Sequence, residues 1–146
     1  MLRTAIVLTL ALLACLLLAG CGGRETIAGA TPTATAEGFI EAMKAAEYDT
    51  VAAGFEFETY ARANNENWDS IPPGQRSQIV RKLREDQANK LEALAGMFTG
   101  EATVSNVQEQ GGSASVAINA GANTLMLQMK QMEGEWLITT MVEQTG

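Results

Sequence analysis

The spacing of apolar residues changes at Gly100, and this change constrains the fold more than any other feature of the chain. Between residues 36 and 98 the apolar side chains recur every three or four positions, as they do on helices that bury one face. After Gly100 apolar and polar residues alternate, as they do on half-buried strands. Helices followed by strands predict one α+β domain, in which a sheet buries one face against the helices.

Three N-terminal helices are expected. The first is expected to begin at Thr31–Pro32, because Thr is a favourable N-cap and Pro suits the first turn, with Thr33 and Thr35 as alternative N-caps. It extends to Glu47. In the second, Asp49 is expected to cap a helix that runs through Phe55 toward Tyr60.

The third predicted helix spans residues 74–97 and follows a polar loop at residues 62–70. Its apolar residues fall on a single face, so we expect one buried stripe. That stripe consists of Ile79, Val80, Leu83, Leu91, Leu94, Ala95 and Phe98, with Gln87 as its one polar gap.

Four strands are expected after Gly100, the last of them at residues 135–143. Glycines mark the three connections between the strands, at Gly111–Gly112, Gly121 and Gly134. Such turns between successive strands predict an antiparallel meander. In the first strand the apolar phase slips between Val104 and Val107, which indicates a β-bulge.

The N-terminus predicts export and lipidation. After Arg3 comes an apolar run of fifteen residues, 5–19, which is shorter than the ~20 residues of a spanning helix. A positive start, a short apolar run and small residues at its end are typical of a secretory signal peptide. The run ends in Leu18-Ala19-Gly20-Cys21, which resembles the bacterial lipobox. The resemblance implies a diacylglyceryl thioether on Cys21 and cleavage before it.

This lipobox divides the chain into a signal peptide at residues 1–20, a lipidated Cys21 with a flexible tether at 21–34, and an α+β domain at 35–146. Two or three acyl chains anchor a protein stably, since each buried CH₂ contributes ~0.8 kcal/mol. The expected place is the outer side of the cytoplasmic membrane or the outer membrane. The outer membrane is favoured in a host with two membranes, because Gly22 rather than Asp follows the cysteine.

The order of the elements resembles the nuclear transport factor 2-like superfamily, whose curved sheet and helices enclose a conical cavity. Two short motifs are similar to the lipoproteins of domain of unknown function 4878, namely Ala46-Glu47-Tyr48-Asp49 after the first helix and Gly134-Glu135-Trp136-Leu137-Ile138 in the last strand. The likeness covers residues 33–143. It implies three helices on a curved four-stranded antiparallel meander, and it says little about activity.

The part of the chain after the lipobox is acidic. Nine Lys and Arg and all seventeen Asp and Glu follow Cys21, which gives a net charge of −8 without any histidine. This charge argues against nucleic acid as a partner. Histidine, the commonest general base and metal ligand, is absent from the sequence. Cys21 is the only cysteine outside the predicted signal peptide. We therefore expect no cofactor and no metal site.

Few residues offer catalytic chemistry. The superfamily resemblance implies that an enzyme of this kind would place an Asp or His with a Tyr inside the cone. The available groups are Tyr48, Asp49, Tyr60 and Asp69. Tyr48–Asp49 is better explained as a helix–helix turn with a capping carboxylate, and no residue expected inside the cone is acidic. We therefore do not expect an enzyme, with a cone-cavity isomerase or hydrolase as the alternative.

Two further clusters have competing interpretations. Three methionines, Met126, Met129 and Met132, suggest a copper site, because thioethers are soft ligands. A three-residue step alternates the faces of a strand, however, so the three side chains cannot converge on one ion. We therefore interpret them as core residues or as the lining of an apolar cavity.

Four cationic side chains lie on the third predicted helix, those of Arg76, Arg81, Lys82 and Arg84. Each would add ~1 kcal/mol of attraction to an anionic bilayer, but a solvated face paired with Glu85 and Asp86 is favoured.

The candidate contacts with a ligand or partner are Trp68, Trp136, Tyr60 and Met129. Trp136 shares a strand face with Ile138 and is expected in the core or cone, whereas Trp68 lies in an Asn-rich loop without an apolar pattern. We expect a membrane-anchored, non-enzymatic accessory domain of the cell envelope that binds a small apolar ligand or an envelope protein. A purely structural envelope lipoprotein is the remaining alternative.

Overall fold

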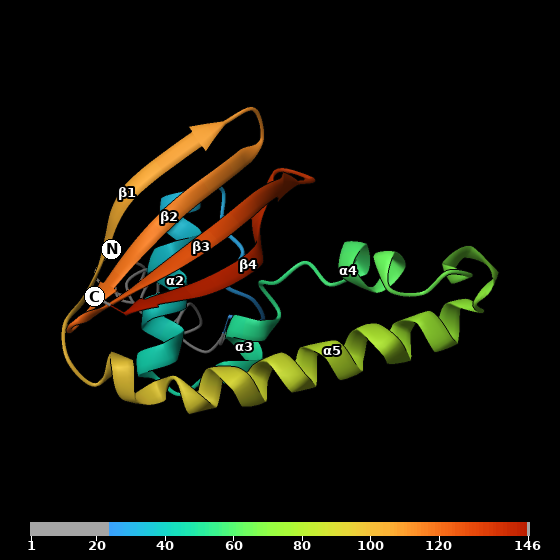
Figure 1. Ribbon diagram of the computed structural model, residues 1–146, viewed down its shortest axis with the longest axis horizontal. Helices are drawn as coiled ribbons and strands as arrows, with labels where there is room; N and C mark the ends of the chain where they lie inside the picture. Colours follow the sequence, from blue (N-terminus) through green and yellow to red (C-terminus); the bar gives the residue numbers. More distant parts are fainter. Residues whose placement is uncertain (1–23, 146) are drawn as a thin grey trace, which may run out of the picture.

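A four-stranded antiparallel sheet carries helices on one face in the computed structural model, which describes residues 24–145 (Figure 1). The strands lie in chain order, so each pairs with the next along the sequence. They are β1 (Ala102–Gln110), β2 (Ser113–Ala120), β3 (Asn123–Met132) and β4 (Glu135–Thr145). The α+β class and the antiparallel meander predicted from the sequence are confirmed.

The turns and irregularities of the sheet also follow the sequence pattern. Gly112 and Gly134 have φ of 80° and 82°, in the left-handed region that glycine adopts without strain, and they allow the tight first and third hairpins. The register of β1 against β2 shifts between Ser105 and Gln108, which confirms the predicted bulge. A second shift, beside Met129, leaves one residue of β4 unpaired.

Four α-helices precede the sheet in the described residues. They are α2 (Pro32–Lys44), α3 (Tyr48–Ala52), α4 (Glu58–Ala63) and α5 (Pro73–Ala93), with 3₁₀ turns η1 (Trp68–Ser70) and η2 (Ala95–Phe98). Of the three candidate threonines, Thr31 caps α2, and its hydroxyl accepts a hydrogen bond from the Ala34 N–H at 3.1 Å. The helix ends before Glu47, because Ala46 takes a left-handed conformation with φ of 57°.

The second predicted helix is wrong in its start and its extent. Asp49 lies in the first turn of α3, and Glu47 occupies the N-cap position without a side-chain hydrogen bond. The helix ends at Ala52 because Phe55 forms a parallel bridge with Ile138 of β4, which requires extended backbone. The chain becomes helical again in α4. The sequence predicts the end of the second helix and the beginning of the polar loop in this region.

The packed domain begins before residue 35, so the predicted tether boundary needs correction. Ile27 is buried, and the Gly29 carbonyl accepts a hydrogen bond from the Trp136 N–H at 2.8 Å. An apolar side chain and a sheet bridge thus hold this segment, although its Gly- and Thr-rich composition resembles that of a linker. The expected signal peptide and the lipidated Cys21 lie outside the described residues.

The core lies between α2 and the sheet. Phe39 and Phe98 pack with ring centroids 5.7 Å apart, and they meet strand residues such as Leu125, Leu127 and Ile138. These five side chains are 0–3% exposed. Burial of each large apolar side chain contributes about 1.5–3 kcal/mol, so this layer supplies most of the stabilisation of the domain.

The N-terminal half of α5 extends beyond the sheet together with α4 and η1, and residues 58–84 form a projecting arm (Figure 1). The predicted single buried stripe of α5 is therefore only partly correct. Leu91 is buried, whereas Ile79, Val80 and Leu83 are half-buried. The physical reason is that the sheet ends before the helix does, so the outer half of the stripe is covered only in part.

Candidate functional site

Two of the four candidate contact residues lie in the core. Trp136 and Met129 are each 2% exposed and belong to the same apolar cluster as Ile138. The expectation that Trp136 and Ile138 share a buried strand face is confirmed. A ligand would reach Trp136 or Met129 only by displacing core side chains.

Tyr60, the third candidate, lies in a groove between the base of the arm and β4, which we call the aromatic groove. Tyr60 is 59% exposed, more than any other large hydrophobic residue that the structure describes. The groove has a volume of about 480 Å³. Its apolar lining comes from Phe55, Phe57, Tyr60, Leu83 and Met141, and its polar rim from Glu56, Asp86, Gln87, Lys90, Thr139 and Thr140.

The floor of the aromatic groove is formed where the chain leaves α3 and joins the edge of β4. The Glu56 N–H donates to the Ile138 carbonyl at 2.9 Å, which holds this short segment extended. Phe55 and Phe57 stack with ring centroids 6.0 Å apart and an interplanar angle of 14°. Phe55 is buried and Phe57 is half-buried, so the pair connects the core to the groove.

The start of α4 places Tyr60 beside this pair. The Glu56 carboxylate accepts a hydrogen bond from the Thr59 N–H at 3.0 Å and satisfies a free donor at the beginning of the helix. Tyr60 follows Phe57 by three positions, which brings the two side chains to the same side of the first turn. Its ring therefore adds a partly exposed aromatic surface to the stacked pair.

The opposite wall comes from α5 and from the irregular part of β4. Leu83, Asp86, Gln87 and Lys90 recur at helical spacing and so share one face of α5. Gln87, the polar gap in the predicted stripe, lies at this rim, where a polar side chain meets solvent. The charged side chains of Lys90, Glu56 and Asp86 surround apolar residues in this groove. The groove is therefore suited to apolar or amphipathic ligands.

The four groups named above as candidates for catalysis lie in three different elements, α3, α4 and η1. Tyr48 and Asp49 lie in the first turn of α3, where Asp49 is exposed. Asp69 lies in η1 and pairs with Arg62 at 3.3 Å, and Tyr60 lies in the aromatic groove. Among the described residues, the carboxylate of Asp69 therefore has an arginine and not a tyrosine as its hydrogen-bond partner.

The space between sheet and helices, where a conical cavity would lie, is filled by apolar side chains. Thr35 is the one buried polar residue among the described residues. Its hydroxyl donates to the Trp136 carbonyl at 3.0 Å and accepts from the Gly29 N–H at 2.9 Å, so it serves the packing of the N-terminal segment. Among the residues that the structure describes, no Asp or Glu is buried in this interior.

Trp68, the fourth candidate, is 3% exposed and packs within the arm, in a second groove beside α5. The sequence predicts an irregular loop at residues 62–70, whereas Trp68 belongs to the 3₁₀ turn η1, which holds its indole in this groove. Sequence reasoning also missed Phe57 and Met141 as groove residues and assigned Leu83 to the core. The alternation Phe55-Glu56-Phe57 between two helical segments was the available signal for an aromatic pair at the edge of the core.

The described residues hold no cluster of three or more Asp, Glu, Cys or His side chains that would bind a metal ion. The described helices include none with the length and apolar character to cross a membrane. Comparison of the chain with protein-family models, curated proteins and solved structures finds no match.

Proposed function

We propose that the chain is an exported lipoprotein, anchored through Cys21, whose domain binds a small apolar ligand in the aromatic groove without catalysing a reaction. The proposal includes a nuclear transport factor 2-like fold with a filled cone. Its place would be the outer side of the cytoplasmic membrane, or the outer membrane of a host with two.

The observation that carries the binding role is the exposure of Tyr60 in the groove that the stacked Phe55 and Phe57 also line. Large aromatic side chains that stay partly exposed next to one another mark binding surfaces more often than isolated ones do. The groove volume of about 480 Å³ falls within the roughly 300–1,000 Å³ of small-molecule sites, which combine apolar walls with a few polar groups.

The filled interior supports a non-enzymatic role. A cone-cavity isomerase or hydrolase needs a carboxylate of tuned acidity beside a buried donor, in a space that excludes water. The described interior holds Leu125, Leu127 and Trp136 in that place and no carboxylate. A purely structural role would leave the exposure of Tyr60 without an explanation.

Native mass spectrometry of the membrane-extracted protein tests the binding role. We expect an apolar molecule to co-purify with the wild-type chain and to be lost from Tyr60→Ala and Met141→Ala. Met132→Ala is the matched control, because Met132 is exposed on β3 and lies outside the groove. A wild-type protein that carries no ligand would contradict the proposal, and so would a bound protein segment in place of a small molecule.

The anchor is tested separately. Cys21→Ser should leave an uncleaved precursor that takes up no labelled palmitate, while the wild-type chain is labelled and processed. Normal processing of the variant would contradict the lipoprotein assignment and would leave the groove proposal standing.

A further inference from the structure

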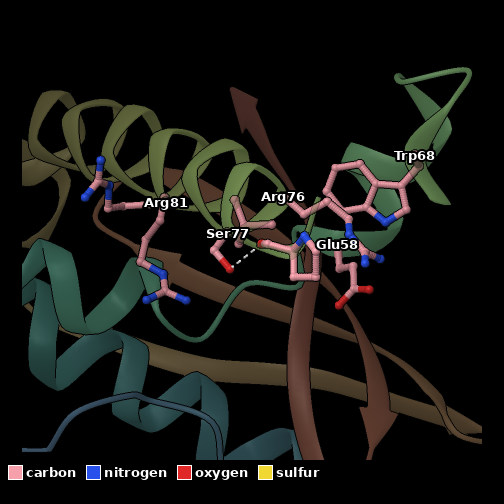
Figure 2. A pocket seen from close by; sticks show the side chains of 8 residues that line it. Glu58, Trp68, Arg76, Ser77 and Arg81 are labelled. Atoms are coloured by element: carbon pink, nitrogen blue, oxygen red, sulfur yellow. Dashed lines mark hydrogen bonds between the residues drawn. The ribbon is translucent and has the colours of Figure 1, made fainter. Parts of the chain in front are cut away.

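The arm carries a groove of its own, distinct from the aromatic groove, between η1 and the first half of α5 (Figure 2). It has a volume of about 460 Å³. Its polar lining consists of Glu58, Trp68, Arg76, Ser77, Arg81 and Arg84, and we call it the arginine groove. Figure 2 shows the indole of Trp68 beside the side chain of Arg76, with Arg81 farther along α5.

Two buried N–H donors in this groove have no acceptor within the described chain. The Nε1 of Trp68 and the Nε of Arg76 are both inaccessible to solvent and make no hydrogen bond. Trp68 as a whole is 97% buried, since only 3% of its surface is exposed. Buried polar groups are nearly always hydrogen-bonded, so two orphaned donors on residues that line one groove indicate an acceptor from outside the described residues.

The charges around these donors favour an anionic acceptor. Glu58, the one carboxylate of the lining, pairs with Arg62 at 3.5 Å. Arg81 pairs only loosely with Glu85, at 3.7 Å. Among the described residues no carboxylate lies within 4.0 Å of the guanidinium of Arg76 or Arg84. Three arginines therefore line a groove of an otherwise acidic chain.

We propose that the arginine groove binds a phosphate group. Because both donors are covered in this structure, the phosphate displaces the side chains above them to accept from the Trp68 Nε1–H and the Arg76 Nε–H. The guanidinium groups of Arg81 and Arg84 supply charge and further donors. Arginine is suited to this role, because its planar group donates two parallel hydrogen bonds to phosphate oxygens. The groove lies at the N-terminal end of α5, where the helix macrodipole also favours negative charge.

Ser77 is not part of the donor set, because its hydroxyl already donates to the Pro73 carbonyl at 3.0 Å (Figure 2). The phosphate has two available sources, an anionic lipid headgroup or a free phosphate compound. Both present the same oxygens to the arginines. The site does not depend on the aromatic groove, so the failure of one leaves the other untouched.

Heteronuclear NMR of the isotope-labelled full chain in detergent tests this site, because the chain has two tryptophans and hence two indole N–H signals. Titration with inorganic phosphate, against chloride at equal ionic strength, should shift the Trp68 signal saturably and leave that of Trp136 in place. Arg76→Gln and Arg84→Gln should each weaken binding about tenfold, the usual effect of losing one charge-assisted hydrogen bond.

Lys82→Gln is the matched control, since it removes the same charge from the same helix but does not line the groove. If all three variants weaken phosphate binding equally, net charge alone attracts phosphate, and the proposed site is contradicted. A Trp68 signal that phosphate does not shift would contradict it as well. Arg84 is exposed, so Arg84→Gln keeps the test decisive if Arg76→Gln misfolds.

Soluble short-chain lipids distinguish the two sources. Tighter binding of dihexanoylphosphatidylglycerol than of inorganic phosphate, with no effect of dihexanoylphosphatidylcholine, assigns the site to an anionic headgroup. Tighter binding of inorganic phosphate assigns it to a free phosphate compound.

Discussion

Gly54 shows how a single residue fixes the approach of three segments. Its N–H donates to the Val51 carbonyl at 3.0 Å and its carbonyl accepts from the Ile138 N–H at 2.8 Å. A Cβ at this position would collide with Cγ1 of the buried Ile27. The absence of a side chain therefore allows α3, β4 and the N-terminal segment to meet.

Gly54→Ala is expected to lower the free energy of unfolding by about 1–3 kcal/mol, the usual cost of overpacking a core. Gly96→Ala should change it little, because nothing lies within 4 Å of a Cβ added there. Urea unfolding followed by circular dichroism measures both variants. Similar losses for the two would contradict the close contact at Gly54.

Thr35 supports a second prediction at this scale. Replacing it with Val removes the hydroxyl between the Gly29 N–H and the Trp136 carbonyl and leaves both backbone groups short of a partner. The expected loss of stability is about 1–3 kcal/mol, the cost of an unsatisfied buried group. Thr33→Val, on the same helix and without such a bridge, is the control. An equal melting temperature for the two variants would refute the bridge.

Residues of the site differ in how well the sequence reveals them. Alternation in β4 is enough to bury Trp136 with Ile138, because strand faces follow a period of two. No comparable pattern covers Trp68, whose burial depends on the meeting of η1 and α5. Thr35 looks in the sequence like any polar helical residue, since its partners lie in the N-terminal segment and in β4.

Among the elements, α5 has two different environments along its length. Its C-terminal half packs against α3 and the core through Ala88 and Leu91. Its N-terminal half belongs to the arm, where Ile79, Val80 and Leu83 are half-buried. Helical periodicity predicts which face of α5 is apolar. It does not predict how far along the helix that face is covered, because this depends on the other elements of the fold. The strands were more predictable because glycines mark their ends.

This difference predicts uneven hydrogen exchange along one helix. Backbone amides of residues 78–84 should exchange at least about tenfold faster than those of residues 88–93, because local opening of the arm exposes little buried apolar surface. Exchange measured by NMR on the folded protein gives both sets from the same sample. Uniform protection along α5 would show that the arm is as stable as the core.

For the whole molecule, the arm and the body are two packing units that share one helix. The body closes an apolar core between α2 and the sheet, whereas the arm has Trp68 and Ala61 as its buried residues. Both proposed binding surfaces involve the arm, the aromatic groove at its base and the arginine groove along it. A filled body with a less stable arm fits a domain that binds at its periphery.

Urea should therefore unfold the arm before the body. The two indole N–H signals report the units separately within one unmodified molecule, Trp68 for the arm and Trp136 for the core. The native Trp68 signal is expected to disappear at a lower urea concentration than that of Trp136, since two-state behaviour requires coincident transitions and the arm buries far less apolar surface. Saturating phosphate should then move the Trp68 transition toward that of Trp136, because a ligand stabilises the state that binds it. Coincident transitions without phosphate would mean that the arm unfolds together with the core, and the arginine groove would then be a rigid part of the body.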